Sequence, residues 1–305
     1  MPLQGGVRRG DRVRVIVRAR PLPVGMTVLG CTILSVMTTQ RDRQFAQPAD
    51  GASAGVVSGL LIKPVRHEPM EPVEIAQAEA RQGLVGDCHA KPLGPRQLLM
   101  VREESLADLD VEPWQVRANV ATRGLPEEAL ASGNVLQLGP EVRVRVTHVC
   151  EVCKVLRQYV SSETFRALPR RRGSLAVFLT GGRVALGDRI TVGGAHYPEV
   201  PEGIYERLEW ILARVPEGRI VTYDTLVTLL GVARPYFRVL PTYLKRADRA
   251  GLPAHRVLNS AGELGGHLPG QTRRLRAEGV VIGPEGVFGD EARRWKGEGL
   301  YFAKR

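Results

Sequence analysis

Residues 141–149 read EVRVRVTHV, and this alternation decides the fold of the middle of the chain. A valine stands at every second position from Val142 to Val146, and arginines stand between the valines. Because successive side chains of an extended strand point to opposite faces, the valines share one face and the arginines the other. The pattern therefore predicts a half-buried β-strand with an apolar and a polar face.

The neighbouring segments extend this β-rich pattern in both directions. An apolar run over 54–65 predicts a strand, and residues 175–192 predict two strands joined as a hairpin at Gly181-Gly182. The best helix candidate of the region is PRQLLMVREESLADL, residues 95–109. We predict a β-barrel with small helical insertions over residues 55–200.

The hydrophobic period becomes helical after residues 192–203, which are rich in glycine and proline and predict a domain boundary. Apolar residues from Ile204 to Val215 recur at helical spacing, and Pro216 ends that helix.

Two further helices are predicted beyond this first one. Thr222 can cap a helix over 223–230 that Gly231 closes, and residues 234–250 predict another helix. A short turn containing glycine, followed by a helix rich in arginine and lysine, outlines a helix-turn-helix. A small helical bundle with a solvated basic face fits the same pattern. The predicted fold class is thus α+β and multidomain.

The length and the net charge of the chain limit the class of protein to which it can belong. The 305 residues suit two domains, and an apolar fraction of 43% indicates globular folding. The net charge of +11 is concentrated toward the two ends of the chain, so an anionic polymer is a plausible partner for one or both ends. No apolar run approaches the ~20 residues of a membrane span, so we expect no membrane partner.

The first 54 residues predict a basic leader and linker without fixed structure. Their charged start and apolar run imitate a signal peptide, but no small-residue cleavage site follows, so export is the weaker interpretation. Met26 and Met37 are alternative starts. A cytoplasmic location is expected because the four cysteines lack disulfide spacing, namely Cys31, Cys88, Cys150 and Cys153.

Three ordered motifs in the last third point to a known family. They are PEGRIVTYDTLVTLLGVARPYFRVLPTYLKRA (216–247), LPAHRVLNSAGEL (252–264) and LRAEGVVI (275–282). Together they resemble the DNA-binding domain of O6-alkylguanine-DNA alkyltransferases and alkyltransferase-like proteins. The resemblance implies a winged helix-turn-helix domain over 203–290, followed by a C-terminal tail at 291–305.

The acceptor cysteine of that family is replaced here. The family motif is Pro-Cys-His-Arg, whereas this chain has Ala254 at the cysteine position, and it contains no cysteine beyond Cys153. Since a thiolate is the nucleophile of alkyl transfer, this domain is predicted not to be an alkyltransferase. His255 and Glu278 match the family's base and its orienting carboxylate, and without the thiol we expect them to remain as a structural pair.

Recognition of damaged DNA can survive the loss of the thiol. The resemblance assigns Tyr223 to the phosphate of a rotated nucleotide and Arg238 to the space that a flipped base vacates. The implied partners are double-stranded DNA with alkylated guanine and nucleotide-excision repair proteins. The further residues expected at the DNA or lesion are Arg234, Lys245, Arg246, Arg249, Ala254, His255 and Arg256, although for the exposed cations a solvated surface charge is the alternative.

Two positions depart from the family pattern. Alkyltransferase-like proteins carry tryptophan where this chain has Ala254, so we expect a wider base pocket. Pro241 falls where the family usually has glycine, and we expect it to kink or shorten the recognition helix.

The middle of the chain resembles a second family. Residues 83–106, 116–125, 135–156 and 170–192 together resemble a MOSC domain, the C-terminal β-barrel module of molybdenum-cofactor sulfurases. The resemblance implies molybdenum or sulfur chemistry, with Cys153 as catalytic residue or molybdenum ligand, a possible molybdenum cofactor, and a donor that binds pyridoxal phosphate. The residues matching the family's polar cleft are Asp87, His89, Arg96, Gln97, Asn119 and Thr122.

The chemistry of this cleft stays open at the level of sequence. Arg96 and the side-chain amides could hold an anionic pterin or an oxyanion, but Ala118 replaces a glutamate usual in the family. Cys150 and Cys153 could form a redox pair, half of a zinc site with His148 or His89, or plain buried thiols.

Three functions therefore remain open. The leading hypothesis is a MOSC barrel fused to a domain that recognises alkylated guanine without repairing it. The alternatives are a MOSC enzyme that its C-terminal domain only localises, and two inactive interaction modules.

Overall fold

A computed structural model describes residues 54–303 apart from residues 67, 284–285 and 287. The predicted leader therefore lies almost wholly outside the described residues, as do Cys31 and the alternative starts. The described residues cluster as one compact unit.

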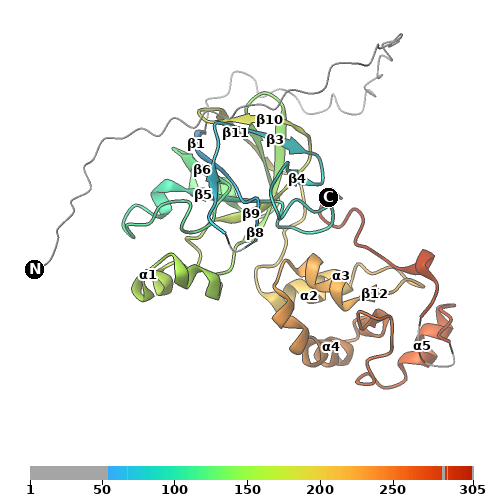
Figure 1. The fold of residues 1–305 in the computed structure, drawn as a ribbon. Coiled ribbons are helices and arrows are strands. Elements are labelled where there is room, and N and C mark those ends of the chain that lie inside the picture. Colours follow the sequence, from blue (N-terminus) through green and yellow to red (C-terminus); the bar gives the residue numbers. More distant parts are fainter. Residues whose placement is uncertain (1–53, 67, 284–285, 287, 304–305) are drawn as a thin grey trace, which may run out of the picture. The chain divides into compact units, whose positions relative to one another are not determined.

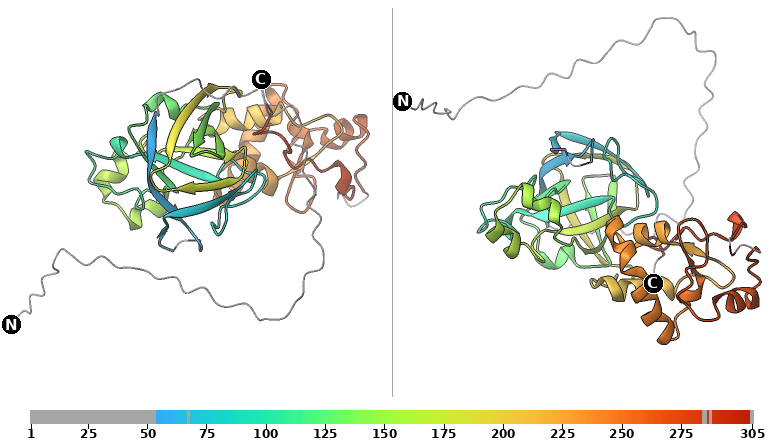
Figure 2. Two further views of the ribbon diagram at one scale, coloured as in Figure 1. Left: turned by 90° about the horizontal axis from the view of Figure 1, so that it is seen from above. Right: turned by 60° about the horizontal axis from the view of Figure 1, so that its bottom comes forward.

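The middle of the chain is a closed β-barrel (Figure 1, Figure 2). Seven strands follow one another in the order β11-β7-β8-β9-β5-β6-β1, and pairing of β11 with β1 closes the ring. The β1–β11 pairing is antiparallel and joins Gly55 to Ile190. The bounds are β1 Gly55–Ile62, β2 Glu71–Pro72, β3 Ile75–Glu79, β4 Gly83–Leu84, β5 Leu98–Arg102, β6 Val120–Arg123, β7 Asn134–Leu138, β8 Val142–Val149, β9 Ser174–Phe178, β10 Gly182–Ala185 and β11 Arg189–Ala195, with one short helix, α1 Ser162–Ala167.

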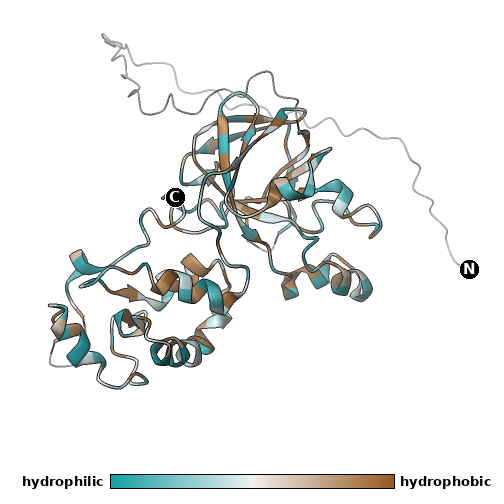
Figure 3. Cartoon of the chain, turned by 180° about the vertical axis from the view of Figure 1, so that it is seen from behind, coloured by the Kyte–Doolittle hydropathy of each residue, from teal (hydrophilic) through white to brown (hydrophobic). Residues whose placement is uncertain are grey.

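Alternating side chains build the interior of the barrel, as the opening motif predicts. Val142, Val144 and Val146 of β8 are fully buried in the barrel core. The barrel strands carry both hydrophobic and hydrophilic segments (Figure 3). The other face of β8 departs from the prediction, because Arg145 is also fully buried; it donates to the carbonyl oxygens of Pro198, at 2.7 Å, and Tyr301.

Two local predictions in the barrel are wrong. Residues 95–109 form strand β5 followed by a single 3-10 turn at Glu103–Ser105, not a helix. Both faces of β5 are buried, with Met100 in the barrel core and Val101 in a second apolar cluster, so this strand lacks the alternation that would identify it. The predicted hairpin at Gly181-Gly182 is also absent, because β9 pairs with β5 and β8 whereas β10 pairs with β3.

The last third is helical, which confirms the predicted α+β fold class with a barrel followed by a helical domain. A buried apolar cluster from the first three of its helices forms most of its core. The elements are α2 Ile204–Leu212, β12 Val221–Thr222, α3 Tyr223–Leu230, a 3-10 turn at Arg234–Arg238, α4 Leu240–Arg249, a 3-10 turn at Ala254–Arg256, β13 Val257–Leu258, α5 Gln271–Ala277 and a 3-10 turn at Glu291–Arg293.

Pro241 does not disturb the helix in which it lies. The helix α4 begins at Leu240, so Pro241 occupies the first turn, where no intrahelical acceptor awaits its missing N–H. The single helix predicted over 234–250 is instead divided into a 3-10 turn and α4. The expected kink therefore does not form, because the proline lies at the beginning of the helix and not in its middle.

Buried arginines connect the barrel to the helical elements. The Arg207 side chain of α2 is fully buried; it donates to the Glu151 carboxylate at 2.7 Å and to the Leu230 carbonyl at 2.9 Å. Arg96 donates to the Gly231 carbonyl at 2.7 Å. In the segment predicted as a tail, Tyr301 is buried in the core of the helical elements.

Candidate functional site

The loop that carries Ala254 is held by a carboxylate. Glu278 accepts a hydrogen bond from His255 Nε2 at 2.7 Å and ion-pairs with Arg256 at 2.8 Å. Its second oxygen accepts the backbone N–H of Gly218 at 3.0 Å. Burial alone would raise the pKa of Glu278, but these donors outweigh it and lower the pKa to about 2. The expected pair of His255 and Glu278 is therefore part of a larger network, which fixes the loop to the start of β12.

Ala254 itself is completely buried in the core of the helical elements. Its neighbour His255 has a buried Nδ1 with no hydrogen-bond partner among the described residues. The loop thus keeps an imidazole and a carboxylate in contact beside a methyl group that has no reactive atom.

Tyr223 begins α3 and lies in a small aromatic group. Its ring stacks on Phe237, with centroids 6.2 Å apart, and its hydroxyl lies 3.3 Å from Nε2 of His267. Burial raises the pKa of Tyr223 to about 12, so its phenol keeps the proton and can donate a hydrogen bond. Sequence reasoning missed Phe237 and His267; the Gly265-Gly266 pair before His267 was the one available signal of a special loop.

The predicted basic residues lie at and after the turn between α3 and α4. Arg238 is exposed at the end of the 3-10 turn and has no ion-pair partner within the described part of the chain. Lys245, Arg246 and Arg249 are exposed on α4, and the Arg246 guanidinium lies 3.8 Å from the centre of the Tyr205 ring. The Arg234 side chain lies outside what the structure describes.

The predicted cleft residues of the barrel fall into two groups. Asp87, His89 and Asn119 meet: the Asp87 carboxylate accepts from Asn119 Nδ2 at 2.7 Å and from the His89 backbone N–H at 2.7 Å. Gln97 and Thr122 are instead buried among backbone partners, with Gln97 donating to the carbonyls of Arg81 and Lys91 and Thr122 bonding the carbonyl of Val101. Arg96 contacts the helical elements, as described above.

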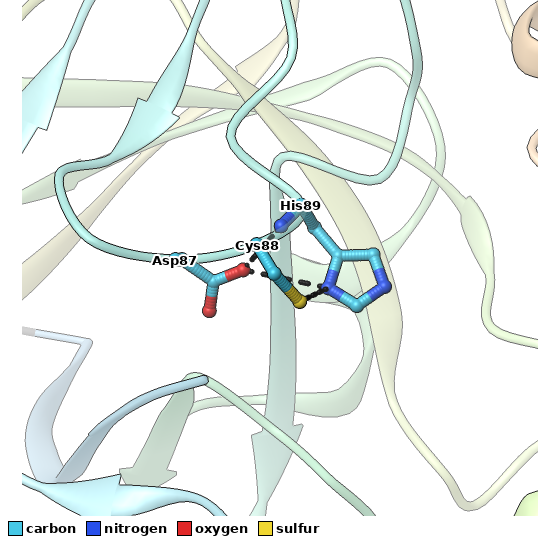
Figure 4. Close-up of side chains that lie close together, drawn as sticks. All are labelled: Asp87, Cys88 and His89. Carbon is cyan, nitrogen blue, oxygen red and sulfur yellow. Dashed lines mark hydrogen bonds and ion pairs between the residues drawn. The ribbon is translucent and has the colours of Figure 1, made fainter. Parts of the chain in front are cut away.

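Residues that the sequence did not single out complete the cleft. Cys88 Sγ lies 3.4 Å from His89 Nδ1 (Figure 4), and buried Lys63 donates its backbone N–H to Asp87 at 3.0 Å. Burial and the charge of Arg117 lower the pKa of Lys63 to about 8. Arg117 is buried too, and its guanidinium donates to the Tyr159 hydroxyl and the Glu68 carbonyl.

Burial and neighbouring groups set the resting charges of this cleft. Although burial opposes it, hydrogen bonds from His89 and Lys63 lower the pKa of Asp87. Burial and the Asp87 charge raise the pKa of the Cys88 thiol. Contact with Asp87 favours the protonated His89 ring, but burial and the charges of Lys63 and Arg96 lower its pKa on balance. The cleft thus combines a carboxylate, a thiol and an imidazole with several cations.

Cys153 lies on the loop after β8. It is half-buried, and its sulfur lies 3.8 Å from a guanidinium nitrogen of buried Arg172. Cys150 is buried, and both thiols are free. Within the described residues the one cluster of three potential metal ligands is Asp87, Cys88 and His89, and it includes neither Cys150 nor Cys153.

No helix among the described residues is both long and apolar enough to span a bilayer.

Family models match both halves of the described chain. The MOSC domain model matches residues 86–191, and the model of the 6-O-methylguanine DNA methyltransferase, DNA binding domain, matches residues 204–280.

Two relatives share sequence with the chain. A DNA base-flipping protein of Escherichia coli is 31% identical over 100 residues, a match that covers 32% of this chain and 78% of that protein. A bifunctional methyltransferase/endonuclease of Picrophilus torridus is 32% identical over 82 residues, which cover 26% of this chain and 28% of that protein.

Two solved structures also show similarity. The YUAD protein from Bacillus subtilis is 20% identical, with a TM-score of 0.40, over 45% of this chain and 94% of that one. S. pombe Atl1, in complex with damaged DNA containing O6-carboxymethylguanine, is 25% identical, with a TM-score of 0.28, over 30% of this chain and 94% of that one.

Proposed function

Because the chain belongs to the family of alkyltransferase-like DNA base-flipping proteins through its helical domain and carries a MOSC domain before it, we propose that it binds DNA containing O6-alkylguanine without removing the alkyl group. The observation that supports this most directly is the loop at Ala254. His255, Arg256 and Glu278 form one network beside a residue that cannot accept an alkyl group.

The groups that would hold an extruded nucleotide are next to one another. Tyr223 can donate a hydrogen bond to a phosphate oxygen, because its phenol stays protonated at neutral pH. Arg238 follows directly on Phe237, which stacks on Tyr223, and its exposed guanidinium is free to enter a duplex. Extruding a base costs a few kcal/mol, less for a damaged pair, and an inserted cation would fill the vacated space.

The exposed cations of α4 would add affinity without reading sequence. Lys245, Arg246 and Arg249 can each neutralise a phosphate. Because the lesion would be bound and not repaired, a second activity must remove it, and nucleotide-excision repair proteins are the partners we expect.

A binding measurement on the full chain tests the proposal. Fluorescence anisotropy at physiological salt would compare a duplex carrying one O6-methylguanine with the same duplex carrying guanine. We expect tighter binding to the lesion, a loss of that preference in Arg238→Ala and Tyr223→Ala, and no alkyl transfer. Arg166→Ala, which removes an exposed arginine from α1 of the barrel, is the matched control. Equal affinity for both duplexes in the wild type would refute damage recognition.

The barrel supports a second candidate function, binding of an anionic ligand of the molybdenum-cofactor type. Buried Lys63 and Arg117 near the cleft provide positive charge, and Arg172 lies beside Cys153. This donor chemistry fits the group, because cations suit a phosphate and a half-buried thiol suits molybdenum. Cys153 would be the metal ligand, Lys63 and Arg117 would hold the anion, and a sulfur-carrier role would require a pyridoxal-phosphate-dependent donor.

Metal analysis tests this second function. Protein purified from cells supplied with molybdate should contain molybdenum in the wild type and much less in Cys153→Ala. Cys150→Ala is the matched control, since it removes the neighbouring thiol. Equal molybdenum in wild type and Cys153→Ala would refute Cys153 as the ligand, and absence of molybdenum from both would refute the function.

A further inference from the structure

Three different donor atoms come together in the turn that follows β4. The sulfur of Cys88 lies 3.4 Å from His89 Nδ1, and the same nitrogen lies 3.4 Å from Asp87 Oδ1. The three ligand atoms all lie within 4.8 Å of one another (Figure 4). Asp87 is buried, while Cys88 and His89 are partly accessible, so a small ligand can reach the point that the three atoms share.

The three side chains are arranged to bind one metal ion and not to relay a proton from the thiol to the carboxylate. In a relay of thiol, imidazole and carboxylate, one ring nitrogen faces the nucleophile and the other faces the carboxylate. Here the single nitrogen Nδ1 faces both Cys88 and Asp87. His89 cannot pass a proton between them through the ring, but all three lone pairs can point to one centre.

The distances fit a tetrahedral metal ion. With metal–sulfur and metal–nitrogen bonds of about 2.3 and 2.0–2.1 Å, the edge between sulfur and nitrogen of a tetrahedron is about 3.5 Å. The edge between nitrogen and a carboxylate oxygen is about 3.3 Å. Both observed separations are 3.4 Å, so two of the three edges already match those of a tetrahedral site, and the third, between the Cys88 sulfur and the Asp87 oxygen, is within 4.8 Å.

The surroundings already hold the carboxylate in place. Asp87 Oδ2 accepts from Asn119 Nδ2 at 2.7 Å and from the Lys63 backbone N–H at 3.0 Å. Its Oδ1 accepts the His89 backbone N–H at 2.7 Å and keeps a second lone pair on the side of the ring. Such outer-shell hydrogen bonds orient metal ligands in proteins. Nearby cations oppose a bare dication, but a thiolate and a carboxylate together cancel its charge, so the complete site is neutral once the Cys88 thiol has released its proton to solvent.

We propose that Asp87, Cys88 and His89 bind a borderline-soft divalent cation of the Zn²⁺ type, with the fourth position open to solvent or a ligand. Thiolate, imidazole and carboxylate are the donors that zinc takes in proteins, and three protein ligands with one open position are typical of catalytic zinc. The site goes beyond both functions proposed above, because it uses neither Cys153 nor the helical domain.

Cobalt(II) provides the test, because a bound thiolate gives it a near-ultraviolet charge-transfer band and tetrahedral geometry gives it intense visible bands. Full-length protein treated with a chelator would be titrated with Co²⁺. We expect one equivalent to bind with both features and Zn²⁺ to displace it. Cys88→Ser should lose the charge-transfer band, whereas the matched control Cys150→Ser, at a thiol that neither proposed site uses, should keep it.

A second variant tests the site without touching a ligand. Asn119→Ala removes the outer-shell donor to Asp87 and should weaken metal binding about 10–100-fold while the charge-transfer band persists. Circular dichroism would establish that each variant is folded. The proposal is overturned if the wild type shows no charge-transfer band, or if Cys88→Ser retains it.

Discussion

Replacement of Glu278 by glutamine should destabilise the helical domain at neutral pH. The side chain is 11% exposed and accepts hydrogen bonds from His255, Arg256 and the Gly218 N–H. These donors lower its pKa from 4.5 to about 2. At 1.36 kcal/mol per pKa unit, this lowering corresponds to about 3 kcal/mol of folding free energy at pH 7. Because glutamine keeps one acceptor oxygen, we expect a loss of about 2–3 kcal/mol.

The dependence on pH separates this electrostatic cause from a packing defect. A carboxyl whose pKa is lowered by folding stabilises the native state above its unfolded pKa and loses that effect as the pH falls. The contribution is complete above about pH 6, begins to fall near pH 4.5 and is less than half of its full value by about pH 3. The stability difference between wild type and Glu278→Gln should shrink in parallel.

Urea unfolding followed by tryptophan fluorescence measures this difference. A Trp114→Phe background removes the barrel tryptophan, so that Trp210 and Trp295, which both pack on the helical core, report the helical domain. Exposed Glu217 is the matched control, and Glu217→Gln should change stability by less than about 0.5 kcal/mol. A difference between wild type and Glu278→Gln that stays constant from pH 7 to pH 4, or equals that of the control at pH 7, would refute the argument.

Three further predictions follow from burial and charge. Ala254→Trp forces an indole into a fully buried position and should lower the free energy of unfolding by about 1–3 kcal/mol; an unchanged urea midpoint would instead reveal a pocket that fits it. Arg207→Leu leaves the Glu151 carboxylate and the carbonyls around α2 without their donor and should cost about 3–5 kcal/mol in urea unfolding, whereas a neutral effect would contradict the buried pairing. Replacing Lys245 and Arg249 together by alanine should reduce the slope of log affinity against log salt by about 2 while leaving the ratio of lesion to undamaged binding unchanged; a changed ratio would show that they contact the lesion.

Sequence patterns predicted the fold where one face of an element is buried. Val142 to Val146 identify β8 because the barrel wall buries alternate positions. The pattern failed at 95–109, since β5 lies between two apolar clusters and its four consecutive buried residues could equally belong to a helix. It also failed at Gly181-Gly182. The two glycines indicate a turn, but they do not determine which strand β10 pairs with, and that strand is the distant β3.

The candidate sites were predictable where a motif is local and fixed in order. Tyr223, Ala254 and Glu278 follow from ordered motifs, and the structure brings the Ala254 loop and Glu278 into contact. Lys63 could not be found this way, because only the folded chain brings the residue after β1 to Asp87, 24 positions further along. Cys88 lies between two predicted site residues in the sequence. Nothing in the GDCH motif shows, however, that its sulfur and the Asp87 carboxylate both contact Nδ1 of His89.

The loop between β8 and β9 explains why the barrel and the helical elements should not be treated as independent. Glu151 lies between Cys150 and Cys153, its carboxylate binds Arg207 of α2, and its backbone carbonyl accepts from Arg172. Arg172 in turn lies beside the Cys153 sulfur. A substitution such as Arg207→Leu therefore removes support from the cysteine loop as well as from the end of α3. Its effects must be measured both on DNA binding and on metal content before either is assigned to one domain.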